Sequence, residues 1–221
     1  MKVSEIFLSI DGEGINAGKL AVFIRLFGCN LNCSWCDSRY AICGSDFREM
    51  TVDQVIEKAE SFNIKSVTLT GGEPLIHEQI DELITGLIER GFQVNLETNG
   101  AVDISKYVRM DGVLITMDLK CPSSRMENRM MFQNIEKMRQ ADVLKAVVTE
   151  SDLGYLKNKL IEMKPRCHIF LSPVFGAIQP VKLVEFLKSL SCHPETNELS
   201  QQIRVQMQLH KIIWNCWQRG V

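Results

Sequence analysis

Three cysteines within eight residues mark the stretch of the sequence best suited to chemistry. Cys29, Cys33 and Cys36 directly follow an apolar run, and Trp35 precedes the last of them. Thiolates are soft ligands, and closely spaced sets of them hold zinc ions or iron–sulfur clusters. A structural zinc and a four-iron cluster both normally take four protein ligands, so three cysteines leave one metal position open to another ligand. The alternative is a zinc knuckle that borrows a fourth ligand, such as Cys43.

Four further short stretches carry charged side chains, most of them beside glycine. They are residues 11–14 (DGEG), 71–74 (GGEP), 97–100 (ETNG) and 118–120 (DLK). Glycine lets the backbone approach a ligand closely, and a carboxylate near carbonyl groups can bind an ammonium group. Taken singly, each stretch is compatible with an ordinary turn, and a Lys–Asp pair in a loop is usually solvated.

Two single residues are candidates for binding a ligand. Arg25 lies inside the apolar run 20–27, and its guanidinium needs an anionic partner because it does not deprotonate. From spacing alone, a structural ion pair is the favoured interpretation of Arg25. His210 ends a stretch, 204–210, in which polar and apolar residues alternate. A buried histidine satisfied by the backbone is the alternative to a role in a site.

The spacing of apolar residues predicts that strands and helices alternate along most of the chain. Such alternation implies right-handed crossovers and a parallel sheet. A complete eight-fold barrel usually needs ~250 residues, so we expect an α/β fold with a partial (β/α)6-type barrel of roughly six parallel strands. The predicted strands are residues 3–10, 20–27, 66–70, 92–96, 112–117, 141–148, 168–172 and 204–210, and the predicted helices are residues 52–62, 76–88, 125–139, 153–161, 183–190 and 211–217.

This fold would bring the candidate residues together. In parallel α/β folds the chemistry lies at the carboxyl ends of the strands. The cysteine loop and the four polar stretches each follow a predicted strand, so we expect them to converge on one face of the sheet. This convergence is a stronger argument than any single motif.

Length and composition fit one soluble globular domain. The chain has 221 residues, of which 45% are hydrophobic and 24% charged, with a formal net charge of −2. This balance gives no indication of binding to nucleic acid or to a membrane, and no apolar run approaches the ~20 residues that span a bilayer. No signal peptide is evident, and a reducing cytoplasm fits a chain whose other cysteines are scattered. Those are Cys43, Cys121, Cys167, Cys192 and Cys216.

The motifs together resemble those of a known enzyme family. The CxxxCxxC spacing and Gly71-Gly72-Glu73-Pro74 resemble the radical S-adenosylmethionine enzymes. Residues 9–14, Arg25 with its strand, and residues 36–38, 97–100 and 204–211 narrow the resemblance to the 7-carboxy-7-deazaguanine synthase family, from about residue 6 to the end of the chain.

The resemblance implies a lyase of queuosine biosynthesis. Such an enzyme converts 6-carboxy-5,6,7,8-tetrahydropterin to 7-carboxy-7-deazaguanine and releases ammonia. It uses a [4Fe–4S] cluster, S-adenosylmethionine and Mg2+, accepts electrons from a flavodoxin or ferredoxin, and forms a homodimer. The resemblance also implies one domain, residues 1–221, with a carboxy-terminal strand and helix that close the pocket.

The resemblance assigns roles to individual positions. The cluster ligands would be Cys29, Cys33 and Cys36, and the Mg2+ ligand would be Ser38, with Asp37 as the alternative. Cofactor contacts would come from Trp35, Cys36, Asp37, Gly71, Gly72, Glu73, Glu97, Asn99, Asp118, Leu119 and Lys120. Substrate contacts would come from Ile10, Asp11, Gly12, Glu13, Arg25, Thr70, His210 and the terminal carboxylate of Val221.

Two positions depart from the pattern of many family members, which have glutamine where this chain has Asp11 and threonine where it has Ser38. An ionised carboxylate at position 11 would accept a hydrogen bond from the pterin but not donate one. Two other functions compete with this interpretation. A glycyl-radical activating enzyme would share the cysteine spacing but act on a protein backbone, and a zinc-stabilised binding module would have no catalytic activity.

Overall fold

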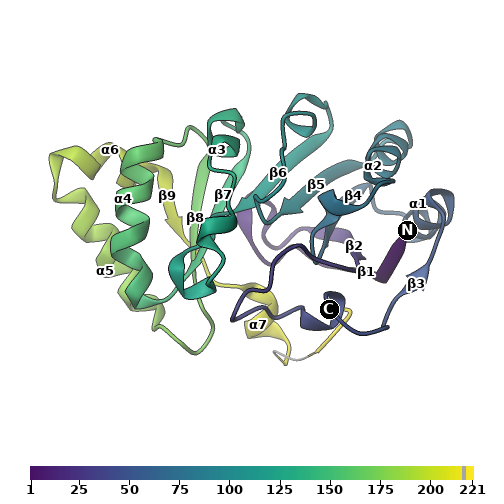
Figure 1. Ribbon diagram of the computed structural model, residues 1–221, viewed down its shortest axis with the longest axis horizontal. Coiled ribbons are helices and arrows are strands. Elements are labelled where there is room, and N and C mark those ends of the chain that lie inside the picture. Colours follow the sequence, from purple (N-terminus) through teal and green to yellow (C-terminus); the bar gives the residue numbers. More distant parts are fainter. Residues whose placement is uncertain (216–217) are drawn as a thin grey trace.

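The chain folds around a single open sheet. The computed structural model describes residues 1–215 and 218–221, and within them nine strands form one sheet in the order β3-β1-β2-β4-β5-β6-β7-β8-β9. Figure 1 shows the helices α1 to α6 packed beside this sheet and α7 on its other side, near the carboxyl terminus. The strands are β1 (Lys2–Ile10), β2 (Leu20–Leu26), β3 (Arg48–Glu49), β4 (Ser66–Gly71), β5 (Gln93–Thr98), β6 (Val113–Asp118), β7 (Val143–Val148), β8 (His168–Pro173) and β9 (Ile203–Val205).

Most of the sheet is parallel, as predicted. Every neighbouring pair from β2 to β9 in this order is parallel, which gives seven parallel strands in the described chain. The sheet does not close, so the prediction of a partial barrel is confirmed. The first strand is the exception: β1 pairs antiparallel with β2, and β3 pairs antiparallel with β1. A short turn, rather than a crossover helix, joins β1 to β2, and such a turn can only reverse the chain.

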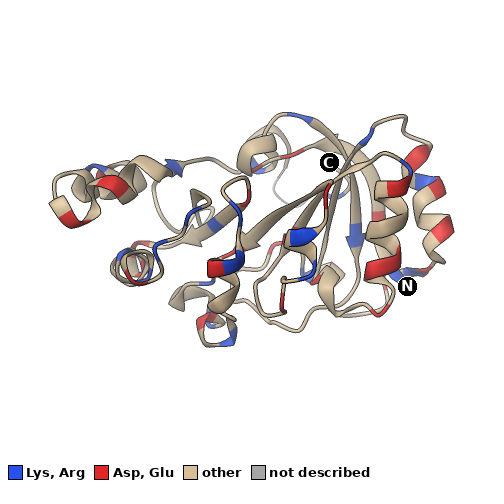
Figure 2. Cartoon of the chain, turned by 90° about the horizontal axis from the view of Figure 1, so that it is seen from above, with Lys and Arg blue, Asp and Glu red and all other residues tan. Residues whose placement is uncertain are grey.

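Helices α1, α2, α4 and α5 bury apolar side chains on one side of the sheet. The seven helices of the described chain are α1 (Val52–Glu60), α2 (Ile80–Glu89), α3 (Gln133–Lys137), α4 (Leu153–Met163), α5 (Pro180–Ser191), α6 (Pro194–Gln202) and α7 (Leu209–Ile213). Thr51 begins α1 with a capping box that it forms with Gln54, which satisfies backbone donors left free at the helix start. Lys and Arg are interspersed with Asp and Glu rather than gathered in one element (Figure 2).

The two faces of the sheet differ in chemistry because side chains alternate along each strand. On β4, Val67 and Leu69 are fully buried in the core that contains Leu83 and Leu87 of α2. Thr68 and Thr70 alternate with them and form hydrogen bonds to polar side chains instead. We call the side of the sheet that carries these threonines the polar face. A ligand could bind there without disturbing the core.

Three predicted elements were wrong. Only Arg204 and Val205 of the predicted strand 204–210 lie in β9, and His210 lies on α7, because the backbone turns where Leu209 donates to the carbonyl of Gly12. The predicted helix 125–139 is reduced to one 3-10 turn, Glu127–Arg129, and the short α3, since Arg125 adopts a left-handed backbone and Met130 an extended one. The predicted helix 211–217 ends at Ile213 in the described residues, and Cys216 and Trp217 lie outside them.

One helix was not predicted at all. Helix α6 buries only Thr196 and Ser200, so it has no apolar periodicity to detect. No helix among the described residues is long and apolar enough to cross a membrane.

Candidate functional site

The three cysteines lie in a loop that directly follows β2. Leu31 donates its backbone N–H to the Cys29 thiol at 3.4 Å, and Asn99 donates its amide to the same sulfur at 3.6 Å. The Cys36 sulfur lies 3.7 Å from the Ser38 hydroxyl. All three cysteines are free thiols. Burial raises the pKa of Cys29 and of Cys33.

Lys120 is a buried cation beside this loop. Its charge favours the thiolate forms of Cys33 and Cys29 against the effect of burial on their pKa, and its ammonium lies 5.5 Å from the centre of the Trp35 ring. Three thiols beside a buried ammonium are a suitable donor set for an iron–sulfur cluster, because each thiolate binds its own iron and the cation offsets negative charge.

A zinc knuckle is not supported by this geometry. No three His, Cys, Asp or Glu side chains in the described part of the chain lie close enough to share one metal ion. Cys43, the proposed fourth ligand, is exposed and its thiol donates to the carbonyl of Arg39. The cysteine loop therefore fits a cluster better than a single zinc ion.

The two glycines at the end of β4 are required by close packing against β2 and the cysteine loop. A Cβ atom at Gly72 would collide with the carbonyl oxygen of Gly28 and with the Cys29 side chain, and a Cβ at Gly71 would collide with the backbone of Leu26. Gly71 also has a φ of +147°, which residues with side chains rarely adopt. These contacts fix the end of β4 directly against the start of the cysteine loop.

Glu73 joins the ends of β4 and β5. It is fully buried and accepts from the backbone of Leu75 at 3.1 Å, the hydroxyl of Thr98 at 2.8 Å and the backbone of Asn99 at 2.7 Å. Burial raises the pKa of Glu73 to about 7, against the opposing effect of these hydrogen bonds. Asn99 in turn contacts Cys29, so Glu73 connects to the cysteine loop through one side chain.

Charged and polar side chains form a ladder across the polar face. Thr70 donates to Glu97 at 2.8 Å, which links β4 to β5. Lys120 lies 2.7 Å from Asp118, and Lys145 lies 3.4 Å from the same carboxylate. Burial alone would raise the pKa of Asp118, but the two lysines hold it below its ordinary value. The ladder therefore keeps Asp118 ionised at neutral pH.

Lys145 was not singled out from the sequence, although a signal for it exists. It lies 2.9 Å from Glu13, which also accepts from the Ser172 hydroxyl at 3.0 Å. Burial works to lower the pKa of Lys145, but Asp118 and Glu13 raise it well above its ordinary value. Lys145 interrupts the apolar run 141–148 as Arg25 interrupts its own run, so the same reasoning would have found it. Ser172 and Gln206, which donates to Ser172 at 3.2 Å, carry no such signal.

The stretch after β1 reaches the polar face by another route than predicted. Because β1 is antiparallel, Ile10 lies beside Leu20 at the start of β2, at the edge of the sheet opposite the cysteine loop. The prediction that residues 11–14 share the carboxyl edge with the other stretches is therefore wrong. The turn instead folds over the polar face, where Thr68 donates to Asp11 at 2.7 Å.

Asp11 is buried there with one oxygen unsatisfied. It is 2% exposed, and its Oδ2 atom has no hydrogen-bond partner among the described residues. Burial raises the pKa of Asp11 to about 7, and the nearby Glu97 carboxylate adds to this effect. Asp11 is therefore a carboxylic acid that changes protonation near neutral pH.

The carboxy-terminal segment packs against the same turn. Gln206 accepts from the backbone of Gly14 at 2.8 Å, and a Cβ atom at Gly12 would collide with the His210 ring. Burial lowers the pKa of His210. Lys211 lies 2.7 Å from Asp37, beside the cysteine loop. For Val221, the described chain shows no hydrogen bond or ion pair to these residues.

Three predicted residues have structural contacts within the protein. Leu119 is 2% exposed and donates its backbone N–H to the carbonyl of Lys145 at 2.7 Å. Trp35 donates its ring N–H to Ser123 at 3.1 Å. Arg25 pairs with Glu5 at 2.8 Å, as the ion-pair interpretation predicts, and Glu5 was missed by sequence reasoning because nothing in its spacing sets it apart.

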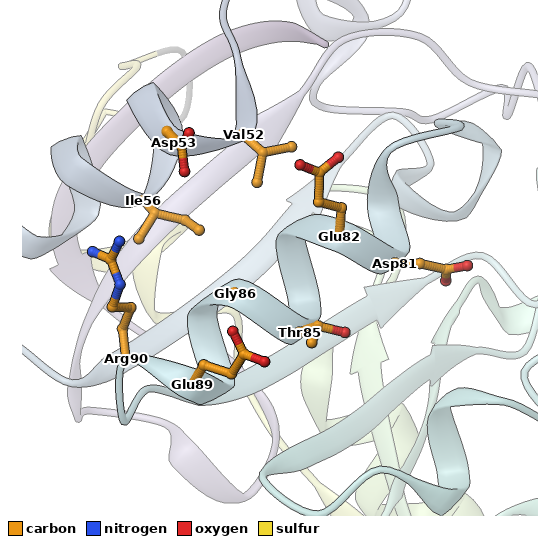
Figure 3. A pocket seen from close by; sticks show the side chains of 9 residues that line it. All are labelled: Val52, Asp53, Ile56, Asp81, Glu82, Thr85, Gly86, Glu89 and Arg90. Carbon is orange, nitrogen blue, oxygen red and sulfur yellow. The ribbon is translucent and has the colours of Figure 1, made fainter.

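Two surface hollows lie away from these residues. The first, of about 420 Å³, lies between α1 and α2 on the outer side of the molecule (Figure 3). The second, of about 620 Å³, is lined by residues that include Lys65, Gln93 and Gly112, at the amino ends of the strands. The cysteine loop contributes to neither hollow.

Comparison with known proteins places the chain in a family. The Radical SAM superfamily matches residues 23–155, more than half of the chain. A 7-carboxy-7-deazaguanine synthase from Clostridium acetobutylicum is 39% identical over 226 residues, which cover 100% of this chain and 99% of that protein. A protein of the same name from Methanospirillum hungatei is 35% identical, covering 96% of this chain and 85% of that protein.

The fold agrees with these sequence relatives. The crystal structure of QueE from Escherichia coli superposes with a TM-score of 0.72 and 23% sequence identity, and the match covers 95% of this chain and 94% of that one. Radical SAM proteins use a [4Fe–4S] cluster and S-adenosylmethionine, which the three free thiols of the cysteine loop fit. The chain therefore belongs to the 7-carboxy-7-deazaguanine synthase family of the Radical SAM superfamily.

Proposed function

We propose that this chain converts 6-carboxy-5,6,7,8-tetrahydropterin to 7-carboxy-7-deazaguanine with release of ammonia. The observation that carries the proposal is the position of Arg25. Its side chain lies next to Thr70 in the sheet register, and its strand leads directly into the cysteine loop. A largely buried guanidinium at this point suits a substrate that carries one carboxylate.

The cofactors would lie between the cysteine loop and the ends of β4 to β6. Cys29, Cys33 and Cys36 would hold the cluster, while Gly72 and Asn99 would contact S-adenosylmethionine. When bound, the reduced cluster and S-adenosylmethionine supply a 5′-deoxyadenosyl radical that abstracts hydrogen from the substrate. The packing of Gly72 against Gly28 and Cys29 keeps the two binding regions adjacent.

The substrate would lie across the polar face. Arg25 would bind its carboxylate, and Thr70 and the turn from Ile10 to Glu13 would contact its ring. Glu13 is held by Lys145 and Ser172, which fixes its carboxylate as a hydrogen-bond acceptor. Asp11 would face the same ring, and in its neutral form it both donates and accepts, as a glutamine side chain does.

Mg2+ binding would involve Ser38. Its hydroxyl lies 3.7 Å from the Cys36 sulfur, at a position where the resemblance gives many family members a threonine hydroxyl. Asp37 is the weaker candidate, because Lys211 already pairs with its carboxylate at 2.7 Å. Mg2+ prefers oxygen ligands and retains several waters, so a single serine is compatible with an ion that also contacts the substrate.

Other features of the proposal concern the whole chain. Residues 1–221 would act as one domain, with the segment after β9 closing the pocket through His210 and Val221. Electrons would come from a flavodoxin or ferredoxin, and the active form would be a homodimer. The free thiols of the described cysteines support an enzyme that works in a reducing cytoplasm.

The test is anaerobic reconstitution followed by product analysis. The reconstituted protein is incubated with dithionite, S-adenosylmethionine, Mg2+ and 6-carboxytetrahydropterin, and the products are identified by mass spectrometry. We expect 7-carboxy-7-deazaguanine. Cys33→Ala should lose the bound iron and the product, whereas Cys121→Ala should keep both, because that thiol is fully buried elsewhere with its pKa raised by burial to about 12.

The other outcomes separate the competing functions. Formation of 5′-deoxyadenosine without 7-carboxy-7-deazaguanine would reject this substrate and favour a glycyl-radical activating enzyme. Equal iron content in Cys33→Ala and Cys121→Ala would reject the cluster ligands.

A further inference from the structure

Glu5 holds the Arg25 guanidinium by one edge only. The two residues are register partners on the antiparallel strands β1 and β2. The Nε atom of Arg25 donates to Oε1 of Glu5 at 2.8 Å, and both side chains are largely buried. The two terminal nitrogens of Arg25 have no hydrogen-bond partner among the described residues. The edge that can bind a carboxylate with two parallel hydrogen bonds is therefore left free.

Tyr40 holds Glu5 from the other side. Its hydroxyl donates to the same oxygen, Oε1, at 2.6 Å. The Arg219 guanidinium lies 3.7 Å from the centre of the Tyr40 ring and 2.7 Å from Asp46. Glu5 is thus fixed by two donors from different parts of the chain, and its carboxylate has little freedom to rotate toward the terminal nitrogens of Arg25.

This geometry differs from that of an ion pair whose only role is stability. An arginine and a carboxylate free to optimise their contact commonly form two parallel hydrogen bonds. Here the carboxylate accepts from both Arg25 and Tyr40 with one oxygen, and the arginine donates to it through Nε alone. The arrangement forgoes a two-bond pair with Glu5 and leaves the edge formed by the two terminal nitrogens of Arg25 available to a ligand.

We propose that Glu5, braced by Tyr40, is a positioning residue that fixes Arg25 through Nε so that its two terminal nitrogens receive the substrate carboxylate. The inference rests on the proposed function, in which Arg25 binds that carboxylate. The role requires the acceptor oxygen of Glu5 rather than its charge. A glutamine keeps this oxygen in place, whereas an alanine removes it.

The test compares Glu5→Gln with Glu5→Ala in anaerobic steady-state kinetics. Glu5→Ala should raise KM for 6-carboxytetrahydropterin about tenfold or more, with kcat within about threefold of the unmodified chain. Glu5→Gln should restore KM to within about threefold. Iron content and cleavage of S-adenosylmethionine without substrate should stay unchanged in both variants, which shows that the fold and the cluster are intact. Glu150→Ala, which removes an exposed ion pair with Lys182, is the matched control.

Three results would overturn the proposal. The first is an unchanged KM in Glu5→Ala, and the second is a fall in kcat of Glu5→Ala without a rise in KM. The third is an equal rise in KM in Glu5→Ala and Glu5→Gln, which would assign the role to the charge of Glu5. If Glu5→Ala does not fold, Tyr40→Phe serves instead. This substitution removes one hydrogen-bond donor to Oε1 of Glu5 and should raise KM about threefold. An unchanged KM would show that Tyr40 does not help to position Glu5.

Failure of the proposed function would look different. In that case the unmodified chain forms no 7-carboxy-7-deazaguanine, and calorimetric binding of 6-carboxypterin replaces the kinetics. Weaker binding in Glu5→Ala with normal binding in Glu5→Gln would still support the positioning role, and equal binding in both would reject it.

Discussion

Asp11 illustrates how a single buried acid can make stability depend on pH. Burial raises the pKa of Asp11 in the folded chain to about 7, from an ordinary value of 3.8. The folded chain therefore keeps a proton on Asp11 that the unfolded chain releases above about pH 4. The stability contributed by this proton is fully present below the unfolded pKa. It is lost as pH rises through the window up to the folded pKa.

Asp11→Asn should therefore flatten the pH dependence of unfolding. Asparagine has the shape of the neutral acid but does not titrate, so the variant should gain stability relative to the unmodified chain by up to about 1.4 kcal/mol per pH unit between pH 4 and 7. The measurement is the midpoint of urea unfolding at several pH values. Parallel curves for the two proteins would mean that Asp11 is ionised throughout this window.

At the scale of elements, close packing and backbone hydrogen bonds together join the end of β4 to the start of the cysteine loop, where Glu73 donates to the carbonyl of Gly28 at 2.9 Å. Gly72→Ala should force this loop to move, because the added methyl group would collide with backbone atoms of Gly28. Overpacking of this kind usually costs about 1–3 kcal/mol. We expect a lower melting temperature together with weaker binding of S-adenosylmethionine by equilibrium dialysis.

Gly154→Ala is the matched control for this substitution. Gly154 lies in α4 with open space where its Cβ would be, so alanine should leave binding unchanged and stabilise the helix by roughly 0.5–1 kcal/mol. A normal melting temperature and normal binding in Gly72→Ala would show that the loop yields without cost.

The sequence predicts elements well where burial alternates and poorly where it does not. The parallel strands and helices α1, α2, α4 and α5 have apolar periodicity, and they lie where this periodicity predicts. The antiparallel direction of β1 was missed because alternation along a strand is the same for both directions. The end of β9 and the start of α7 depend on a contact between Leu209 and Gly12, which no local pattern reveals.

The candidate site could be predicted only in part for a related reason. The cysteines and glycines have distinctive spacing, so they were found. Lys145 and Glu5 are defined by partners that are distant in sequence, Glu13 at 132 positions for Lys145 and Arg25 at 20 positions for Glu5. Pairing of this kind becomes visible only when the sheet brings the strands together.

On the scale of the whole molecule, the carboxyl terminus returns to the first strands. Arg219 contacts Tyr40 and Asp46, and Figure 1 shows the end of the chain beside the segment that follows β2. Deletion of residues 218–221 removes these contacts and the terminal carboxylate. We expect KM for the pterin to rise about tenfold, which corresponds to about 1.4 kcal/mol.

Steady-state kinetics and iron content measure this prediction. S-adenosylmethionine cleavage without substrate should persist in the truncated chain, because the cysteine loop and the ends of β4 and β5 are untouched. An unchanged KM would show that the terminal residues take no part in closing the pocket.

The lysines and the arginine of the polar face that bind or flank the proposed substrate are already paired with carboxylates, and this affects how a charged substrate arrives. Arg25 is paired with Glu5, Lys120 with Asp118, and Lys145 with Glu13. Opposite charges this close cancel at a distance, so the site projects little field into the solvent. A negatively charged pterin would therefore reach the site by diffusion without electrostatic steering, and it would interact with Arg25 only once it is bound. The rate of association should barely change with salt, and selection among anions should depend on shape once they are inside.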